Sequence, residues 1–349
     1  MYAVLDAQAS RGIGSRLGGV LVDAYHFSRF SAAGFSLLVP LLGALAAQPA
    51  LPLSRALLVM GAAAAFHLFA YVLNDVADLA IDRTEPLRAR DPLVRGSMRP
   101  RTALALAVLQ IPIAYAFAAA SGADWRAYAG LTAAFAGMIA YDLYGKRSAF
   151  PPAMDAAQAL AWSALAVFGA LAAGGSVNQL VGLLAGAVFV YVMMINGVHG
   201  PLRDLDNDAR CGARTTAILL GARPARSAAG IMVPPALRRY AIALFVIFLL
   251  TCGSVFIAYG GEAHRAALRA ALVLYACCGA LAAGALVNAL RARAARSVLS
   301  WGMLHLVITL AMLVVPFAVL PGRDQLLLIG AVYAVPVLTM LLRYRVEWS

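Results

Sequence analysis

Charged residues are scarce in this chain. Of its 349 residues only 13% are Asp, Glu, Lys or Arg, while 63% are hydrophobic, and the mean hydropathy is +0.81. Because soluble domains contain about 25% charged residues, this composition excludes an ordinary soluble enzyme. It indicates a polytopic membrane protein that is surrounded by a lipid bilayer.

Cysteine clusters and a dense basic region are also lacking. The four cysteines show no metal-type spacing, so we expect reduced thiols that pack as small hydrophobes. The net charge of +12 is spread over short loops, which excludes nucleic acid as a partner, and no protein partner is evident. The first 28 residues lack the order of a signal peptide, so insertion is expected to depend on the first transmembrane helix.

Apolar runs long enough to cross a bilayer recur along the chain. Each is close to the roughly 20 residues that a spanning helix needs. We expect spans at residues 30–48, 54–73, 102–120, 125–144, 153–173, 178–200, 240–259, 267–290, 298–320 and 325–342. The sequence thus predicts an all-α transmembrane bundle of nine or ten spans. Residues 1–29 form an N-terminal segment, and residues 30–349 form one domain with motif loops at 74–101 and 201–239.

Basic residues are distributed unevenly between the two sides of these spans. With ten spans, one side holds both termini and the loops after spans two, four, six and eight, and it carries 23 of the 28 Lys and Arg residues. The positive-inside rule places that side in the cytoplasm and the protein in the cytoplasmic membrane. Ten spans are preferred to nine, because losing one of the last four would move Arg343 and Arg345 to the other side.

Three aspartates stand close together where the second apolar run ends. Asn74 is followed by Asp75, Asp78 and Asp82, and at about 100° per residue the three carboxylates fall on one helical stripe. Their repulsion and loss of solvation are costly close to a membrane. A bound divalent cation would offset that cost, so this stretch predicts a metal site.

A second acidic cluster follows the sixth span. Asp204 and Asp208 share a helical face, while Asp206 points elsewhere. Two such clusters facing one cavity suit Mg²⁺, which takes a few carboxylates and completes its shell with phosphate oxygens. Basic residues that can bind phosphate accompany the clusters, namely Arg83, Arg88, Arg90, Arg95, Lys146, Arg147, Arg210 and Arg214. Together with the apolar interior they indicate a ligand with a diphosphate head and a hydrocarbon tail.

Three stretches resemble the motifs of the UbiA superfamily of intramembrane prenyltransferases. Residues 74–82 are similar to its first aspartate-rich motif, and residues 204–216 are similar to its second. The tyrosine/lysine stretch between them is matched by Tyr141, Tyr144, Lys146 and Arg147. The resemblance covers roughly residues 29–320 in order and spacing.

This resemblance implies a helical bundle that uses Mg²⁺ to transfer an isoprenyl group from its diphosphate to an acceptor, usually an aromatic ring. It implies one Mg²⁺ on Asp75, Asp78 and Asp82. A second Mg²⁺ would lie on Asp204 and Asp208. The implied catalytic residues are Asp75, Asp78, Asp204 and Lys146. The implied substrate-binding residues are Asn74, Arg88, Arg90, Tyr141, Tyr144, Lys146 and Arg147.

Several alternatives stay open at this stage. The family commonly has an arginine at the position of Asp91, so the arginine that reaches the diphosphate is not fixed. A UbiA-type terpene cyclase, which needs no acceptor, would use the same site, and a phosphoribose-diphosphate acceptor is a less favoured variant. A secondary transporter is disfavoured, because its acids typically lie in the middle of a span. His199 is a candidate contact for the acceptor.

Overall fold

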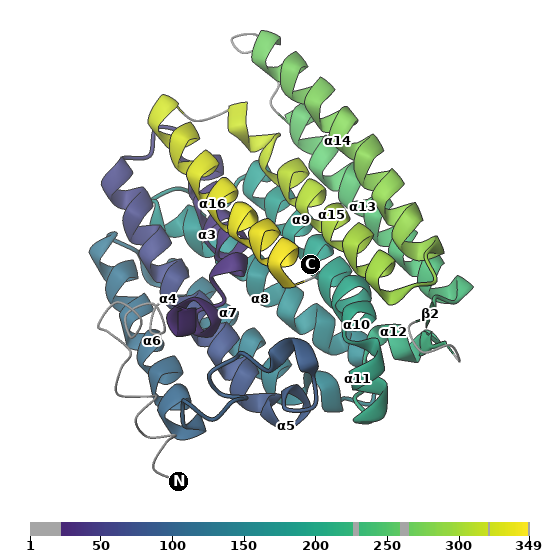
Figure 1. The fold of residues 1–349 in the computed structure, drawn as a ribbon. Helices are drawn as coiled ribbons and strands as arrows, with labels where there is room; N and C mark the ends of the chain where they lie inside the picture. The colour runs from purple at the N-terminus through teal and green to yellow at the C-terminus, as the bar shows by residue number, and fades with distance from the viewer. Residues whose placement is uncertain (1–21, 226–229, 259–264, 320–321, 348–349) are drawn as a thin grey trace.

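The computed structural model describes residues 22–225, 230–258, 265–319 and 322–347, which are mostly helical (Figure 1). Ten helices of at least 16 residues match the ten predicted spans one for one, which confirms the all-α prediction. They are α3 (Phe30–Ala47), α4 (Leu53–Ala77), α6 (Pro100–Ala120), α7 (Trp125–Tyr144), α8 (Pro151–Ala172), α9 (Gln179–Met194), α13 (Pro235–Ala258), α14 (Arg265–Arg291), α15 (Ala295–Val314) and α16 (Arg323–Glu347). Residues 1–21 of the predicted N-terminal segment lie outside the described residues.

Eight spans among the described residues are long and apolar enough to cross a membrane. One of them combines α9 with the turns that follow it, as far as Arg203, and another extends α15 to Val319. The two remaining long helices, α7 and α16, pack along α8 and α3 respectively. The chain is therefore a multi-pass helical bundle.

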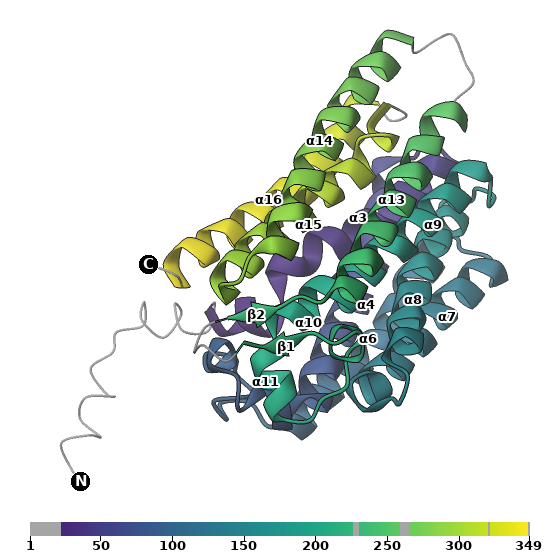
Figure 2. The ribbon, with the colours of Figure 1, turned by 90° about the vertical axis from the view of Figure 1, so that its right-hand side faces the viewer.

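The helices differ in how far they are enclosed by their neighbours. In α3, α4, α8 and the α9 span, 61% of the most apolar window is buried, compared with 22% in α6 and α14. Figure 1 shows α13, α14 and α15 along one edge of the bundle, and Figure 2 shows α16 at the left-hand side of the turned view; α16 packs along α3. The enclosed helices thus form the centre, and the others present apolar side chains to the lipid.

Two glycines allow α3 and α8 to approach closely. A Cβ on Gly43 would lie 2.0 Å from the carbonyl oxygen of Ala166, and one on Gly169 would lie 2.0 Å from that of Pro40. No larger residue fits at either position without moving a backbone. Such small-residue contacts are a common way of packing helices in membranes.

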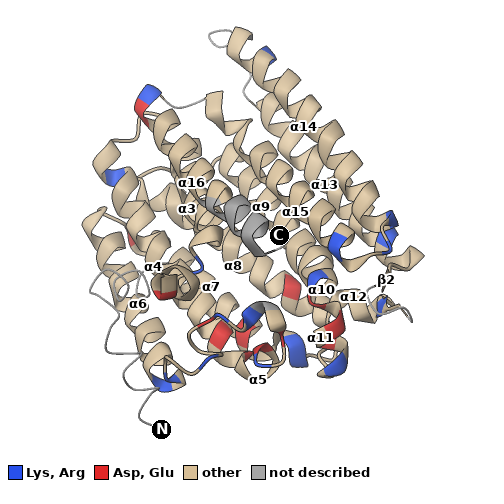
Figure 3. Cartoon of the chain, in the orientation of Figure 1, with Lys and Arg blue, Asp and Glu red and all other residues tan. Residues whose placement is uncertain are grey.

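Short elements gather at one end of the bundle. They are α5 (Leu79–Asp82), η1 (Pro86–Arg88), η2 (Gly145–Arg147), α10 (Gly200–Arg203), α11 (Leu205–Arg210), α12 (Thr216–Leu219), β1 (Arg223–Pro224) and β2 (Ile231–Met232). Figure 3 shows acidic and basic residues gathered in and around these elements.

Hydrogen bonds to backbone carbonyls join the four loops that the sequence places on one side of the membrane. The side chain of Asn207 donates to the carbonyl of Ile81, which links the loops after spans two and six. The amide of Arg214 donates to the carbonyl of Lys146. The amide of Ile231 donates to the carbonyl of Arg293, so the loop after span eight joins the group. The even-numbered loops therefore share one end of the bundle, as the ten-span prediction requires.

A π-helical turn, η3 (Ile195–His199), connects α9 to the second acidic cluster. The amide of Gly200 donates to the carbonyl of Ile195, five residues earlier. A Cβ on Gly197 would lie only 2.9 Å from the ring of Tyr240 on α13, so the turn is held against that helix. Single π-turns inside helices occur frequently next to functional sites.

Candidate active site

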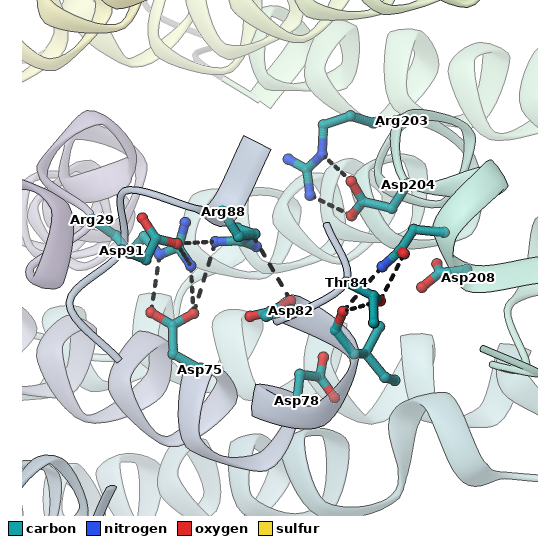
Figure 4. A network of polar contacts seen from close by, with 12 residues as sticks. Arg29, Asp75, Asp78, Asp82, Thr84, Arg88, Asp91, Arg203, Asp204 and Asp208 are labelled. Atoms are coloured by element: carbon teal, nitrogen blue, oxygen red, sulfur yellow. Dashed lines mark hydrogen bonds and ion pairs between the residues drawn. The ribbon is translucent and has the colours of Figure 1, made fainter. Parts of the chain in front are cut away.

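The first acidic cluster does not lie on one continuous helix. Helix α4 ends at Ala77, Asp78 adopts φ −93° and ψ 4°, and α5 begins at Leu79. Asp75 and Asp82 therefore both approach Arg88, whereas Asp78 approaches Lys146. The break at Asp78 ends the continuous helix that the stripe assumed, and the three carboxylates contact different basic side chains (Figure 4).

Two arginines neutralise the first cluster. Arg29 donates two hydrogen bonds to the carboxylate of Asp75, from Nη2 over 2.5 Å and from Nε over 3.1 Å. Arg88 lies 3.9 Å from a carboxylate oxygen of both Asp75 and Asp82. All these side chains are less than one-fifth exposed. Arg29 has a left-handed backbone, φ 49° and ψ 41°, just before α3 begins.

Asp91 provides a third carboxylate on the same side of the site. Its Oδ2 lies 3.3 Å from Nη2 of Arg29 and 3.3 Å from Nη1 of Arg88. A buried carboxylate between two guanidinium groups fixes both of them in place. Asp91, which stands where the family commonly has an arginine, thus positions Arg29 and Arg88. Of the arginines in this loop, Arg88 is the one that faces the acidic cluster.

The second cluster is neutralised by residues near it in sequence and by Lys146. Arg203 holds the adjacent Asp204 through bonds of 2.7 and 2.6 Å. The ammonium of Lys146 lies 3.2 Å from Asp208 and 3.4 Å from Asp78, so it joins the two clusters. Asp206 points out to solvent and pairs with Arg210, in the direction expected from the sequence.

Burial and ion pairing set the charge states at this end of the bundle. Burial raises the pKa of Asp82 to about 7, and the neighbouring Asp75 adds to the rise. Burial also raises the pKa of Asp78 and of Asp208, although Lys146 partly opposes it. Asp204 is the exception. Burial raises its pKa as well, but the positive charges of Arg203 and Lys146 lower it by more, so the pKa lies below the usual range. Asp204 is therefore the most firmly anionic of these carboxylates.

A cavity of about 450 Å³ opens beside both clusters. Its charged end is lined by Asp75, Asp78, Asp204 and Asp208, together with Arg29, Arg88, Lys146, Arg203 and Arg214. Its apolar part is lined by Phe35, Met138, Trp162, Met303, Leu306, Val307 and Leu310. The volume lies within the range of small-molecule sites. Such a cavity fits an amphiphile with an anionic head.

The cavity brings together most of the predicted site residues. Those that line it are Asn74, Asp75, Asp78, Arg88, Tyr141, Lys146, Asp204 and Asp208. Asp82 lies behind them in the pair with Arg88. Arg90 and Arg147 are exposed and Tyr144 is 60% exposed, and none of the three lines the cavity. His199 is likewise not part of the wall; it is buried, 2.9 Å from Nδ1 of His305.

The lining also contains charged residues that the sequence did not mark, among them Arg29, Arg203, Asp142 and Asp155. Arg29 and Arg203 had been counted only as basic residues near the clusters or the termini, and nothing local marks their pairs. Asp142 and Asp155 offered a signal, since each is a carboxylate within a predicted span, where an ionisable residue indicates function. Asp142 accepts a hydrogen bond from Asn74, and Asp155 accepts one from Thr216.

The donor set suits a hard divalent cation that binds together with a phosphate ligand. No group of three or more His, Cys, Asp or Glu side chains is gathered as a metal site among the described residues, because cations stand between the carboxylates. Mg²⁺ needs no such group, since it typically takes one or two carboxylates and fills its shell with water and phosphate oxygens. Asp78, Asp204 and Asp208, all in the cavity wall, fit that requirement.

These features define an intramembrane helical protein whose cavity joins a charged end to an apolar chamber. The chain belongs to the UbiA prenyltransferase family, whose pattern it matches over residues 36–301.

Similar proteins agree with this assignment. The chain is 28% identical over 151 residues to the 4-hydroxybenzoate octaprenyltransferase of Pseudomonas putida (strain GB-1), covering 43% of this chain and 48% of that one. It is 31% identical over 153 residues to the digeranylgeranylglyceryl phosphate synthase of Pyrococcus abyssi (strain GE5 / Orsay), covering 44% and 52%. The matches thus span about half the length of these curated relatives.

Solved structures share the fold. A UbiA homolog from Aeropyrum pernix K1 superposes with a TM-score of 0.60 at 22% identity, covering 80% of this chain and 94% of that one. A UbiA homolog from Archaeoglobus fulgidus bound to GPP and Mg²⁺ gives 0.56 at 19% identity, covering 85% and 98%. At this level of identity the comparison concerns the architecture alone.

Proposed function

We propose that this protein is a Mg²⁺-dependent prenyltransferase that moves an isoprenyl group from its diphosphate to an aromatic acceptor. The observation that carries the proposal is a single cavity that joins two acidic clusters, with Lys146 between them, to an apolar chamber. An isoprenyl diphosphate has a matching division into an anionic head and an apolar tail. The family and the relatives named for prenyl transfer support it.

The charged end would bind and orient the diphosphate. Lys146 and Arg88 line the cavity and can donate to phosphate oxygens. Asp75 and Asp78 in the first cluster and Asp204 and Asp208 in the second would hold the Mg²⁺, and Asp82 would support them through Arg88. Bound Mg²⁺ would withdraw charge from the diphosphate and make it a better leaving group.

The apolar chamber would hold the tail and exclude water. When the bond between the allylic carbon and the diphosphate oxygen breaks, its electron pair leaves with the diphosphate. A carbon of the acceptor ring supplies the pair for the new bond and then loses its proton to the diphosphate product. Trp162 and Tyr141 border this space, and their π faces can stabilise the allylic cation before capture.

The membrane setting follows from the shared end of the four loops. We propose that this end is cytoplasmic, because the excess of Lys and Arg lies there. Diphosphate esters would then reach the charged end from the cytoplasm, while the tail remains among the helices.

A product screen tests the function. Purified protein is incubated with Mg²⁺, geranyl diphosphate and a panel of phenols, and diphosphate release and prenylated products are measured by mass spectrometry. We expect products that require both acceptor and Mg²⁺. Full turnover in EDTA contradicts the proposal, and a cyclic hydrocarbon or alcohol formed without acceptor would identify a cyclase instead.

A further inference from the structure

A layer of polar side chains separates the charged end of the cavity from its apolar chamber. On α8 the lining residues Pro151, Asp155, Gln158 and Trp162 follow one another on one helical face. Pro151 lies at the motif end of that helix and Trp162 lies in the apolar part, so Asp155 and Gln158 lie between them. We call the set formed by Asn74, Asp142, Asp155, Gln158 and Asn196 the polar layer.

Each amide group of the polar layer donates one hydrogen bond to a neighbouring side chain. Nδ2 of Asn74 donates to Oδ1 of Asp142 over 3.2 Å. Asn196 donates to the side-chain oxygen of Gln158, and Nε2 of Gln158 contacts the sulfur of Met138 at 3.4 Å. Each of these amides has a second N–H, and the carboxyl groups of Asp142 and Asp155 add oxygens that a ligand can engage.

One of these oxygens has no partner among the described residues. Oδ2 of Asp142 is buried and makes no hydrogen bond, although the residue, only 6% exposed, belongs to the cavity wall. A buried carboxyl oxygen without a partner is unfavourable and calls for a specific reason. A ligand group that donates to Oδ2 would supply the missing bond.

The carboxyl groups of the polar layer accept hydrogen bonds from neutral side chains, Asp142 from Asn74 and Asp155 from Thr216. The basic residues in the described cavity wall are Arg29, Arg88, Lys146, Arg203 and Arg214. The first four are paired with the carboxylates of the clusters or with Asp91, and Arg214 follows the second cluster beside Lys146. An anionic acceptor would meet two carboxyl groups in the polar layer and no cation.

We infer that the polar layer is the acceptor subsite and that it selects an uncharged acceptor whose N–H or O–H group donates to Asp142. This inference rests on the proposed prenyl transfer and names the class of its second substrate. It places the donating group of the acceptor beside Asn74, one residue before the first cluster, and so brings the acceptor next to the breaking bond.

The test uses two matched pairs of acceptors that differ only by a neutral amide and a carboxylate. They are 4-hydroxybenzamide with 4-hydroxybenzoate, and 1-hydroxy-2-naphthamide with 1-hydroxy-2-naphthoate, each with geranyl diphosphate and Mg²⁺. We expect the amide to be favoured at least about tenfold in kcat/KM in one pair or both. That preference corresponds to about 1.4 kcal/mol or more of differential binding in the transition state.

Variants assign the preference to Asp142. Asp142→Asn keeps an oxygen for Asn74 but offers an amide to the acceptor, so the preference should fall to about twofold or less, with the KM for geranyl diphosphate nearly unchanged. Asp155→Asn should lower it to a smaller degree and serves if the first variant does not fold. The control is Asp124→Asn. It replaces the N-cap of α7, the helix that carries Asp142, by an equally good cap.

Three outcomes would overturn the inference. The first is wild-type protein that uses the carboxylate as well as the amide. The second is a folded, active Asp142→Asn protein with an unchanged preference. The third is diphosphate release without a prenylated product from any of the four acceptors, which leaves the donor half of the proposed function standing. If diphosphate is not released either, the proposed function itself is contradicted.

Discussion

The two aspartate clusters are neutralised from different distances along the chain. In the first, Asp75 is paired with Arg29, 46 residues away. In the second, Asp204 is paired with Arg203, its immediate neighbour. The first arrangement exists only in the folded bundle, whereas the second can form wherever α11 forms. The ion pairing of the first cluster therefore depends on tertiary structure and that of the second on local structure. Lys146 contacts both clusters and couples them.

The largest expected effect tests whether both clusters are needed for catalysis. Asp75→Asn and Asp204→Asn each remove a carboxylate from one cluster without changing its shape. We expect either to lower kcat/KM by about a thousandfold, as loss of a group that stabilises developing charge does. Diphosphate release is the measurement, and Asp124→Asn is the control. If only one cluster responded, the two-cluster clamp would be contradicted.

Replacement of the coupling residue should have the next largest effect. Lys146→Met removes the ammonium between Asp78 and Asp208 and leaves two buried carboxylates facing each other. We expect about a hundredfold loss of kcat/KM, partly recovered in Lys146→Arg. An unchanged rate in Lys146→Met would show that the clusters act independently of this residue.

Stability measurements compare the distant pair with the adjacent one. Arg29→Met leaves Asp75 buried and without its bidentate partner, which should cost about 3 kcal/mol. Arg203→Gln breaks a pair whose arginine is 39% exposed, so its cost should remain below about 1 kcal/mol. Thermal unfolding in detergent gives both values. Mg²⁺ should stabilise Arg29→Met more than the wild type, because the ion replaces the lost cation, and equal losses in the two variants would remove the distinction.

The first cluster should make the stability of the folded protein depend on pH. Because the pKa of Asp82 is raised to about 7 in the folded state, folding favours the protonated form. Stability of the metal-free protein should therefore be greatest in mild acid and decline as pH rises from about 4 through 7. Asp82→Asn should flatten this decline, although Asp78 and Asp208 leave a remainder. A decline that is just as steep in Asp82→Asn would contradict the assignment.

The smallest effect is expected at the exposed edge of the second cluster. Asp206 and Arg210 form a surface pair with side chains 73% and 62% exposed. Asp206→Ala should change stability by less than about 0.5 kcal/mol and leave turnover unaltered. A substantial loss of turnover would show that this acid also serves the site, in disagreement with its direction.

The membrane architecture was predictable because it depends on composition over long windows. The expected spans and the observed helices correspond in number and differ at their ends by a few residues. The uneven distribution of Lys and Arg between the two sides likewise predicted which loops meet at one end of the bundle. What the sequence could not supply was the break at Asp78, since nothing around residues 74–82 distinguishes a continuous helix from an interrupted one.

The motif residues of the site could be predicted from the sequence, whereas many of the other residues that line the cavity could not. Periodicity and resemblance identified carboxylates that do line the cavity, but the resemblance also implied Arg90, Tyr144 and Arg147, which do not line it. Arg29 and Asp91 meet only through tertiary packing. Asp142 lies within a predicted span, and its unpartnered oxygen becomes apparent only when the neighbouring helices are in place.

The π-turn at Ile195–His199 makes the length of the chain before the second cluster a functional quantity. One residue more or less in a helix rotates everything beyond it by about 100°. Deleting a single residue from the regular part of α9 would swing Asp204 and Asp208 away from Lys146, although every motif residue would remain, whereas the π-turn is where the helix already holds one extra residue. The spacing between α9 and the cluster is thus counted in whole residues, and substitutions are easier to accommodate there than a deletion.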